Sequence, residues 1–277
     1  MHELGTALQG VQVQGVQVQG VQVQGVQTQG IKDQGQALAL SELAGVRLEL
    51  ADDGEAVTLH DGQLVAGGLE LTEASRDVAL VATTPAGERI PIAIASIADV
   101  GGSQRIALAS NGWTVCAPGK DGMFVAGSWD ETGAFRAERD RFTYACMDGV
   151  IAKCVDWGYA PWSVGSELHA TCTRLARADY CGDGRSWTLD GTSIDVYDAL
   201  GVQSPVHDPD FDFEAAWGAG GAVCVNATRY DIRDASGRSV EPQCVATLPQ
   251  CASLAEATAL GAVIANDSAH APIDVCG

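Results

Sequence analysis

Nine cysteines, all located after residue 115, constrain the fold of this 277-residue chain more than any other feature. They are Cys116, Cys146, Cys154, Cys172, Cys181, Cys224, Cys244, Cys251 and Cys276. So many cysteines in one part of a chain are typical of disulfide-bonded, exported proteins. We therefore expect four disulfides and one unpaired thiol, with Cys116 or Cys276 as the odd cysteine.

Short separations along the chain favour three disulfide pairs, each of which would limit the unfolded chain. These pairs are Cys146 with Cys154, Cys172 with Cys181, and Cys244 with Cys251. A zinc site that combines these cysteines with His169 is the alternative, but structural zinc ligands are usually spaced more closely. A Cys172 nucleophile with His169 as its base would need a free thiolate. We expect neither a metal site nor a catalytic cysteine.

The strongly acidic composition excludes several classes of partner. With 36 acidic and 16 basic residues, the net charge is −20 at pH 7, which repels nucleic acid and anionic membranes. No run of residues approaches the about 18 apolar residues of a membrane span. No apolar leader follows Met1, so we expect the native signal peptide to be absent from this numbering. The protein is predicted to be secreted or held at the cell surface.

Aromatic residues divide the chain, because the first is Trp113 and the last is Tyr230. Residues before Trp113 can pack only aliphatic side chains, so we expect two different cores. Short apolar runs between Gly, Asp and Pro in residues 50–112 predict an antiparallel, sandwich-like β segment. Residues 113–277 predict a disulfide-rich, mainly β domain with minor α content. Its helix is expected at residues 166–178, capped by Ser166.

A five-residue repeat, GVQVQGVQVQGVQVQGVQTQG, occupies residues 10–30. In an extended chain Val11 and Val13 share one face, but an odd period places the next valine pair on the other. All pairs face inward only if the chain turns at each Gln-Gly step, which glycine permits. A turn of about 90° per word over residues 5–49 resembles the four-sided β-solenoid of the pentapeptide-repeat family. Central positions would be Val13, Val18, Val23, Leu38, Leu43 and Leu48, with Val11, Val16, Val21, Val26, Ile31 and Val46 as the other inward positions.

Such a short solenoid predicts self-assembly. It would expose apolar ends and unpaired backbone groups that can pair with another copy of the chain. A head-to-tail contact of this kind does not close, so it would build a filament. The predicted assembly positions are Val11, Val13, Gly15, Val16, Val18, Gly20, Val21, Val23 and Gly25. There are two alternatives: the repeat is a flexible linker, or the protein is a monomer in which the rest of the chain covers the ends of the short solenoid.

Residues 113–230 resemble the ADYC-domain family, found mainly in exported proteins of myxobacteria. The resemblance rests on FTYACMDGVIAKCVDWGYAPW, ADYCGDGRSWTLDGTSIDVYD and FEAAWGAGGAVCVNATRYD. The second stretch contains the naming motif, Ala178, Asp179, Tyr180 and Cys181. The resemblance implies export, disulfides and surface display, and it supplies no catalytic residues.

Two stretches suggest ligand sites. HDPDFDFE contains His207, and its carboxylates at Asp208, Asp210, Asp212 and Glu214 could bind Ca²⁺, although a solvated acidic loop is favoured. CGDGRSWTLDG places Asp183, Trp187 and Asp190 near glycine turns. An aromatic side chain beside acids is a common sugar-binding pattern, but turn formation explains the same residues.

The function predicted from these features is an extracellular structural protein that polymerises through its repeat. Its predicted partner is a second copy of the chain, and a contact with the cell surface or with polysaccharide is also considered. No Gly-x-Ser-x-Gly, phosphate-loop or HExxH motif is present, so we expect no enzyme activity and no cofactor. The alternative is an exported module that binds or hydrolyses carbohydrate or another surface polymer.

Overall fold

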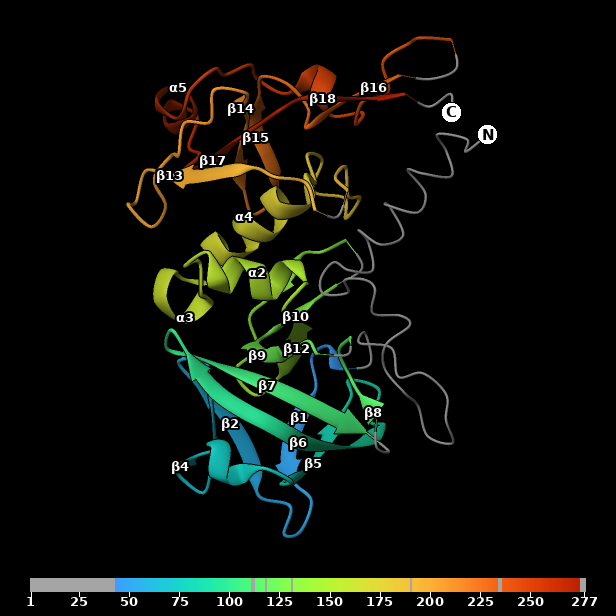
Figure 1. Cartoon of the computed structure of the whole chain (residues 1–277), viewed down its shortest axis with the longest axis vertical. Coiled ribbons are helices and arrows are strands. Elements are labelled where there is room, and N and C mark those ends of the chain that lie inside the picture. Colours follow the sequence, from blue (N-terminus) through green and yellow to red (C-terminus); the bar gives the residue numbers. More distant parts are fainter. Residues whose placement is uncertain are drawn as a thin grey trace.

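The computed structural model describes residues 43–110, 113–117, 119–130, 132–189, 191–233 and 236–274 (Figure 1). The repeat of residues 10–30 and every predicted assembly position lie outside these residues. Within them the protein is mainly β, as predicted. Two sheets lie at opposite ends, and a layer of short helices separates them (Figure 1).

The first sheet is antiparallel and forms from the alternating aliphatic runs. Its strand order is β12-β9-β7-β6-β5-β1-β2-β3-β4, with β8 paired to β7. The strands are β1 (Arg47–Leu50), β2 (Ala56–His60), β3 (Gln63–Ala66), β4 (Leu69–Glu70), β5 (Ala79–Thr83), β6 (Arg89–Val100), β7 (Ser103–Ser110), β8 (Trp113–Thr114), β9 (Gly122–Ala126) and β12 (Phe142–Cys146). Strands β2 to β7, from the segment expected to be sandwich-like, therefore share one sheet with β8, β9 and β12 from the segment that follows it.

A bridge joins the two sides of this sheet. Val46 and Phe142 exchange two backbone hydrogen bonds of 2.8 Å each, which link the start of β1 to β12. The bridge closes β1, β5, β6, β7, β9 and β12 into a ring around one core. Alternate residues of each strand point into it, so Ile90, Ile92 and Ile94 of β6 are all buried there.

The last five-residue units assigned to the predicted solenoid belong to this ring. Leu43, Val46 and Leu48 are buried in its core. Leu48 pairs with Val57 of β2 and Ala82 of β5 in antiparallel register. No solenoid is confirmed at these residues: Leu48 lies in a strand paired on both sides, and Val46 forms a bridge to Phe142.

Three helices form the middle layer: α2 (Val150–Asp156), α3 (Pro161–Val164) and α4 (Ser166–Arg177). Ile151 and Val155 of α2 pack against Met123 and Val125 on the outer face of β9. This strand and β12 are therefore covered on both faces. The helix predicted at residues 166–178 is confirmed as α4, but Gly165 occupies the N-cap position and no side chain caps the helix.

The second sheet packs α4 on one face and α5 (Leu254–Ala259) on the other. Its order is β13-β17-β14-β15. The strands are β13 (Asp195–Asp198), β14 (Asp212–Gly218), β15 (Gly221–Val225) and β17 (Ile264–Ser268). Smaller elements complete the described chain: β10 (Ser128–Trp129) with β11 (Phe135–Arg136), β16 (Tyr230–Arg233) with β18 (Ala271–Asp274), η5 (Glu73–Ser75) and η6 (Val245–Thr247).

Four disulfides are formed, as predicted, but the three expected pairs are wrong. The observed pairs are Cys116–Cys146, Cys154–Cys172, Cys181–Cys244 and Cys224–Cys251. The fold brings distant cysteines together: α2 and α4 lie side by side, so Cys154 meets Cys172 at a Cα–Cα distance of 5.8 Å. Cys116 is paired, and Cys276 lies outside the described residues.

Within the described part of the chain, every helix is too short or too polar to span a lipid bilayer.

Candidate functional site

The segment Ala178-Asp179-Tyr180-Cys181 ends α4 and turns the chain toward the second sheet. Ala178 adopts the left-handed conformation with φ 52° and is fully buried. Its N–H and that of Asp179 donate to the carbonyl groups of Leu175 and Arg174, at 2.9 and 3.0 Å. These bonds satisfy carbonyl groups that would otherwise lack partners at the end of the helix.

Asp179 ties the end of α4 to the loop that follows it. Its buried carboxylate accepts hydrogen bonds from Arg174 and Arg177, the latter at 2.5 Å. It also accepts the backbone N–H groups of Asp183 and Gly184, each at 3.1 Å. One side chain therefore fixes both the helix terminus and the backbone of the loop.

Tyr180 connects the same turn to the second sheet through a buried network. Its hydroxyl donates to Glu214 at 2.9 Å and accepts the backbone N–H of Arg229 at 2.7 Å. Burial raises the pKa of Tyr180 well above its usual value, so the hydroxyl keeps its proton. The Tyr180 ring lies 5.1 Å from that of Trp217.

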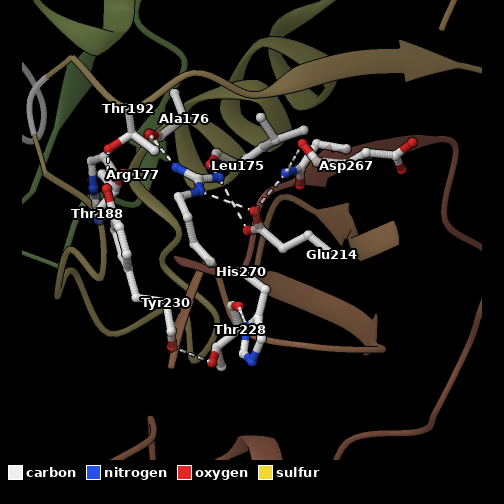
Figure 2. Close-up of polar contacts among 12 residues, drawn as sticks. Leu175, Ala176, Arg177, Thr188, Thr192, Glu214, Thr228, Tyr230, Asp267 and His270 are labelled. Carbon is white, nitrogen blue, oxygen red and sulfur yellow. Dashed lines mark hydrogen bonds and ion pairs between the residues drawn. The ribbon is translucent and has the colours of Figure 1, made fainter. Parts of the chain in front are cut away.

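Arg229 and Glu214 complete this network, and Figure 2 shows Glu214 near Leu175 at the end of α4. Arg229 donates to both carboxylate oxygens of Glu214, at 3.0 and 3.1 Å. The same guanidinium donates to the carbonyl groups of Leu175 and Ala176, at 2.9 and 3.2 Å, and so caps the C-terminus of α4. Glu214 also accepts the Asn266 amide at 2.7 Å. The network joins helix, turn and sheet in one charge-compensated unit.

A pocket of about 360 Å³ opens beside this turn. Its volume lies at the lower end of the range for small-molecule sites. The lining residues are Cys181, Asp183, Arg185, Trp187, Glu241, Pro242, Gln243 and Cys244. Two chain segments far apart in sequence therefore form its walls, residues 181–187 and residues 241–244.

The first wall is fixed to the end of α4. The Ser186 hydroxyl and the backbone N–H of Trp187 both donate to the Arg177 carbonyl, at 3.1 and 3.0 Å. The Asp183 carboxylate accepts the backbone N–H of Arg185 at 3.0 Å. These bonds fix the main chain at Trp187 and the carboxylate of Asp183, and the Trp187 side chain is partly buried against the core.

The second wall is held by the Cys181–Cys244 disulfide. The Cys244 N–H also donates to the sulfur of Cys181 at 3.3 Å. Arg185 and Asp183 are 3.8 Å apart and remain largely exposed, at 56% and 47%, so their ion pair is weak. The pocket combines a half-buried aromatic surface with carboxylate, guanidinium and amide groups. These groups can stack on a ring and exchange hydrogen bonds with hydroxyl groups.

Only part of this site followed from the sequence. Asp183, Trp187 and Asp190 were considered together as a sugar-binding pattern, with turn formation as the other explanation; the structure places Asp183 and Trp187 in one pocket, and Asp190 lies outside the described residues. Arg185, Glu241 and Gln243 were missed. A correct pairing of Cys181 with Cys244, which are 63 positions apart, would have predicted that residues 241–244 lie beside residues 181–187.

The acidic residues considered for calcium do not form a site. Glu214 points inward to Arg229, and Asp208 accepts the backbone N–H of Asp210 at 3.0 Å in the loop before β14. Asp212 begins β14. No three potential metal-ligating side chains come together anywhere in the described ranges.

His169 is fully buried in α4 and is not beside a free thiol. Its Nδ1 lies 2.8 Å from the Tyr159 carbonyl, and Cys172 is bonded to Cys154. Burial lowers the pKa of His169 to about 4, so the imidazole is neutral near pH 7. A neutral Nδ1–H donates to Tyr159, which leaves Nε2 as a bare acceptor. His169 therefore does not act as the base of a free Cys172 thiol, because the Cys172 sulfur is bonded to Cys154.

Comparison with known proteins gives one match. The sequence model of a family described as the ADYC domain matches residues 41–231, which is more than half of the chain. The match covers the first sheet as well as the turn at residues 178–181, so it begins well before residue 113. No curated protein and no solved structure matches the chain.

Proposed function

The chain belongs to the ADYC domain family, and we propose that it is an exported binding module that holds a neutral segment of a surface polysaccharide. The observation that carries the proposal is the pocket in which Trp187 faces polar side chains from two distant segments. Four disulfides support export, because such bonds persist in oxidising surroundings.

The pocket chemistry supports a polyhydroxylated ligand. An indole offers a large, rigid surface for the apolar face of a sugar ring. Asp183 and Glu241 can accept hydrogen bonds from ring hydroxyls, while Arg185 and Gln243 can donate to them. The backbone N–H of Trp187 is bonded to Arg177 of α4 and its side chain is partly buried against the core, which limits the conformational entropy lost when a ligand binds.

Charge favours a neutral ligand. The chain carries a net charge of −20, and the pocket contains two carboxylates against one guanidinium. A polymer of uronic acids would meet like charge over the whole molecule as well as in the pocket. A neutral hexose polymer meets neither.

The contacts of the ADYC turn support binding without catalysis. Asp179 is engaged by two arginines and two backbone N–H groups, and Tyr180 is engaged by Glu214 and Arg229. These side chains are buried and committed to structure.

Calorimetric titration of the full chain with soluble oligosaccharides tests this function. We expect a neutral hexose oligomer to bind, a uronic acid oligomer of equal length to bind at least tenfold more weakly, and Trp187→Ala to lose at least tenfold in affinity for the neutral oligomer. A tenfold loss corresponds to about 1.4 kcal/mol.

The matched control is Trp162→Ala, because Trp162 lies on α3 and packs against the turn at Gly62. This variant should bind like the parent protein. Equal affinities of the parent and Trp187→Ala, or a preference for the uronic acid oligomer, would contradict the proposal.

Self-assembly through the repeat is a second proposal. It is favoured by the valine pairs of residues 10–30 and by glycine at every fifth position, a pattern that a disordered linker does not require. In such an arrangement the repeat would polymerise, and each copy would display one ADYC domain with its pocket.

A further inference from the structure

We propose that Cys181–Cys244 is a site of thiol–disulfide exchange with a dithiol, and that its reduction opens the pocket. The part of this inference that concerns ligand binding rests on the function proposed above. The part that concerns the exchange rests on the disulfide alone.

Exposure separates this disulfide from the other three. Cys181 and Cys244 are both half-buried and line the pocket. The remaining paired cysteines are at most 3% exposed: Cys116, Cys146, Cys154, Cys172, Cys224 and Cys251. Because exchange requires a thiolate to reach a sulfur atom, a reductant reaches the pocket disulfide first.

The disulfide is also the main tether of the second wall. Residues 241–248 are fixed at their borders, where Val240 donates to Ile232 and Pro249 accepts from Val225, at 2.8 and 3.0 Å. Between these points, the hydrogen bond from Cys244 to Cys181 is the one that links the segment to a distant part of the described chain. The other backbone hydrogen bonds of the segment stay within it.

Apolar contacts of the second wall are modest. Pro242 is the one buried residue of segment 241–248, and Val245 and Leu248 are partly buried against the core between α4 and the second sheet. Without the disulfide, these contacts and the two borders remain, so reduction releases residues 241–248 without unfolding the sheet. A segment held by so few contacts opens locally at low free energy.

The hydrogen bond between the two cysteines favours one direction of attack. A thiolate of the reductant attacks the Cys244 sulfur, the S–S bond breaks, and its electron pair moves to Cys181. The Cys244 N–H, 3.3 Å from the Cys181 sulfur, stabilises the departing thiolate, which then takes a proton from water. The second thiol of the reductant resolves the mixed disulfide. The protein gains two thiols, and the dithiol becomes a disulfide.

Differential alkylation of the full chain tests the exchange. Free thiols are first blocked, the folded protein is then treated with increasing dithiothreitol, and the new thiols are alkylated with a second reagent and identified by mass spectrometry. We expect Cys181 and Cys244 to be modified at least tenfold faster than the six buried cysteines. Equal or faster modification of any buried pair would overturn the proposal.

Hydrogen exchange tests the opening without a ligand. Amide exchange of residues 241–248 should accelerate at least tenfold in the partly reduced protein and in the double variant Cys181→Ser with Cys244→Ser, while α4 and β14 keep their protection. Unchanged exchange in this segment would overturn the proposed opening.

Binding to the neutral oligosaccharide separates this proposal from the function on which it rests. Trp187→Ala should keep the selective reduction but lose binding, whereas the double serine variant should lose binding because its second wall is free. If selective reduction and opening are found while the oxidised parent binds no oligosaccharide, the exchange site stands and the proposed function fails. Oligosaccharide binding by the double variant equal to that of the parent would contradict control of the pocket.

Discussion

At the scale of single residues, the ADYC motif is a set of structural contacts. Ala178 provides the left-handed end of α4, Asp179 holds the loop, Tyr180 holds the sheet and Cys181 holds the pocket wall. The next residue, Gly182, has φ +64°, and a Cβ at this position would lie 1.9 Å from the Gly220 carbonyl oxygen. Only glycine fits where the turn approaches the β14–β15 hairpin so closely.

Asp179→Asn should destabilise the fold strongly. The change leaves Arg174 and Arg177 buried beside a neutral amide, and breaking a buried ion pair in this way typically costs about 3–5 kcal/mol. Chemical denaturation measures the loss in the free energy of unfolding. Asp183→Asn is the matched control, because this side chain is 47% exposed, and we expect a change within about 0.5 kcal/mol. Similar losses for both variants would contradict the structural role of Asp179.

His169 should make stability depend on pH. Its pKa is lowered to about 4 by burial, against about 6.5 in the unfolded chain. Between these values the unfolded state binds the extra proton, so stability is complete above pH 6.5 and decreases as the pH falls toward 4. The full loss is of order 3 kcal/mol.

Denaturation of the parent and of His169→Phe between pH 7.5 and 4 measures this loss. The parent should lose of order 3 kcal/mol more than the variant over that range. His60→Gln, a change at the exposed end of β2, should keep the pH dependence of the parent. A parent and His169→Phe variant with parallel pH profiles would show that His169 does not titrate as proposed.

At the scale of elements, local pattern predicts strands and helices better than it predicts their partners. Alternation in RIPIAIASIADV predicts the long β6, and near-helical spacing predicts α4. The helix α2 was missed because VIAKCVD is apolar on nearly every side, since it lies between the first sheet and α4. Its buried position erases the amphipathic signal that identifies a surface helix.

The disulfide pairs and the full pocket could not be predicted from local sequence pattern, because both depend on contacts between segments that are far apart in the chain. Their short separation along the chain favoured a bond between Cys172 and Cys181. Cys172 lies within α4 and Cys181 in the turn after it, and each is bonded to a cysteine from another segment. Trp187 and Asp183 could be read from one stretch of sequence. Glu241 and Gln243 reach the same pocket only through the tertiary fold.

The repeat is the element whose proposed role is tested by deletion. Removing residues 10–30 should abolish assembly of the full chain, because the valine pairs and backbone edges that would contact another copy are removed. Electron microscopy of both proteins at equal concentration measures the effect. Titration with the neutral oligosaccharide is the control, since the pocket lies outside the deleted residues. Filaments from the truncated protein, or none from the full chain, would contradict this role.

At the scale of the whole molecule, a layer of helices separates a ring-closed sheet from a second sheet (Figure 1). Disulfides stabilise each part: Cys116–Cys146 in the core of the first sheet, Cys154–Cys172 between α2 and α4, and Cys224–Cys251 beside the second sheet. The net charge of −20 keeps the surface repulsive toward polyanions. The half-buried Cys181–Cys244 disulfide and the segment at residues 241–248 form the part of the described chain that we propose responds to its surroundings. The pocket lies at this part.

The most direct test of the pocket as the binding site is the indole N–H spectrum of protein labelled with ¹⁵N-tryptophan. The chain has six tryptophans, and Trp187→Phe assigns the resonance of Trp187. On titration with the neutral hexose oligomer, the Trp187 resonance should shift saturably while those of tryptophans away from the pocket stay in place. A Trp187 resonance that does not move at any oligomer concentration, or a saturable shift confined to another tryptophan, would contradict binding at this pocket.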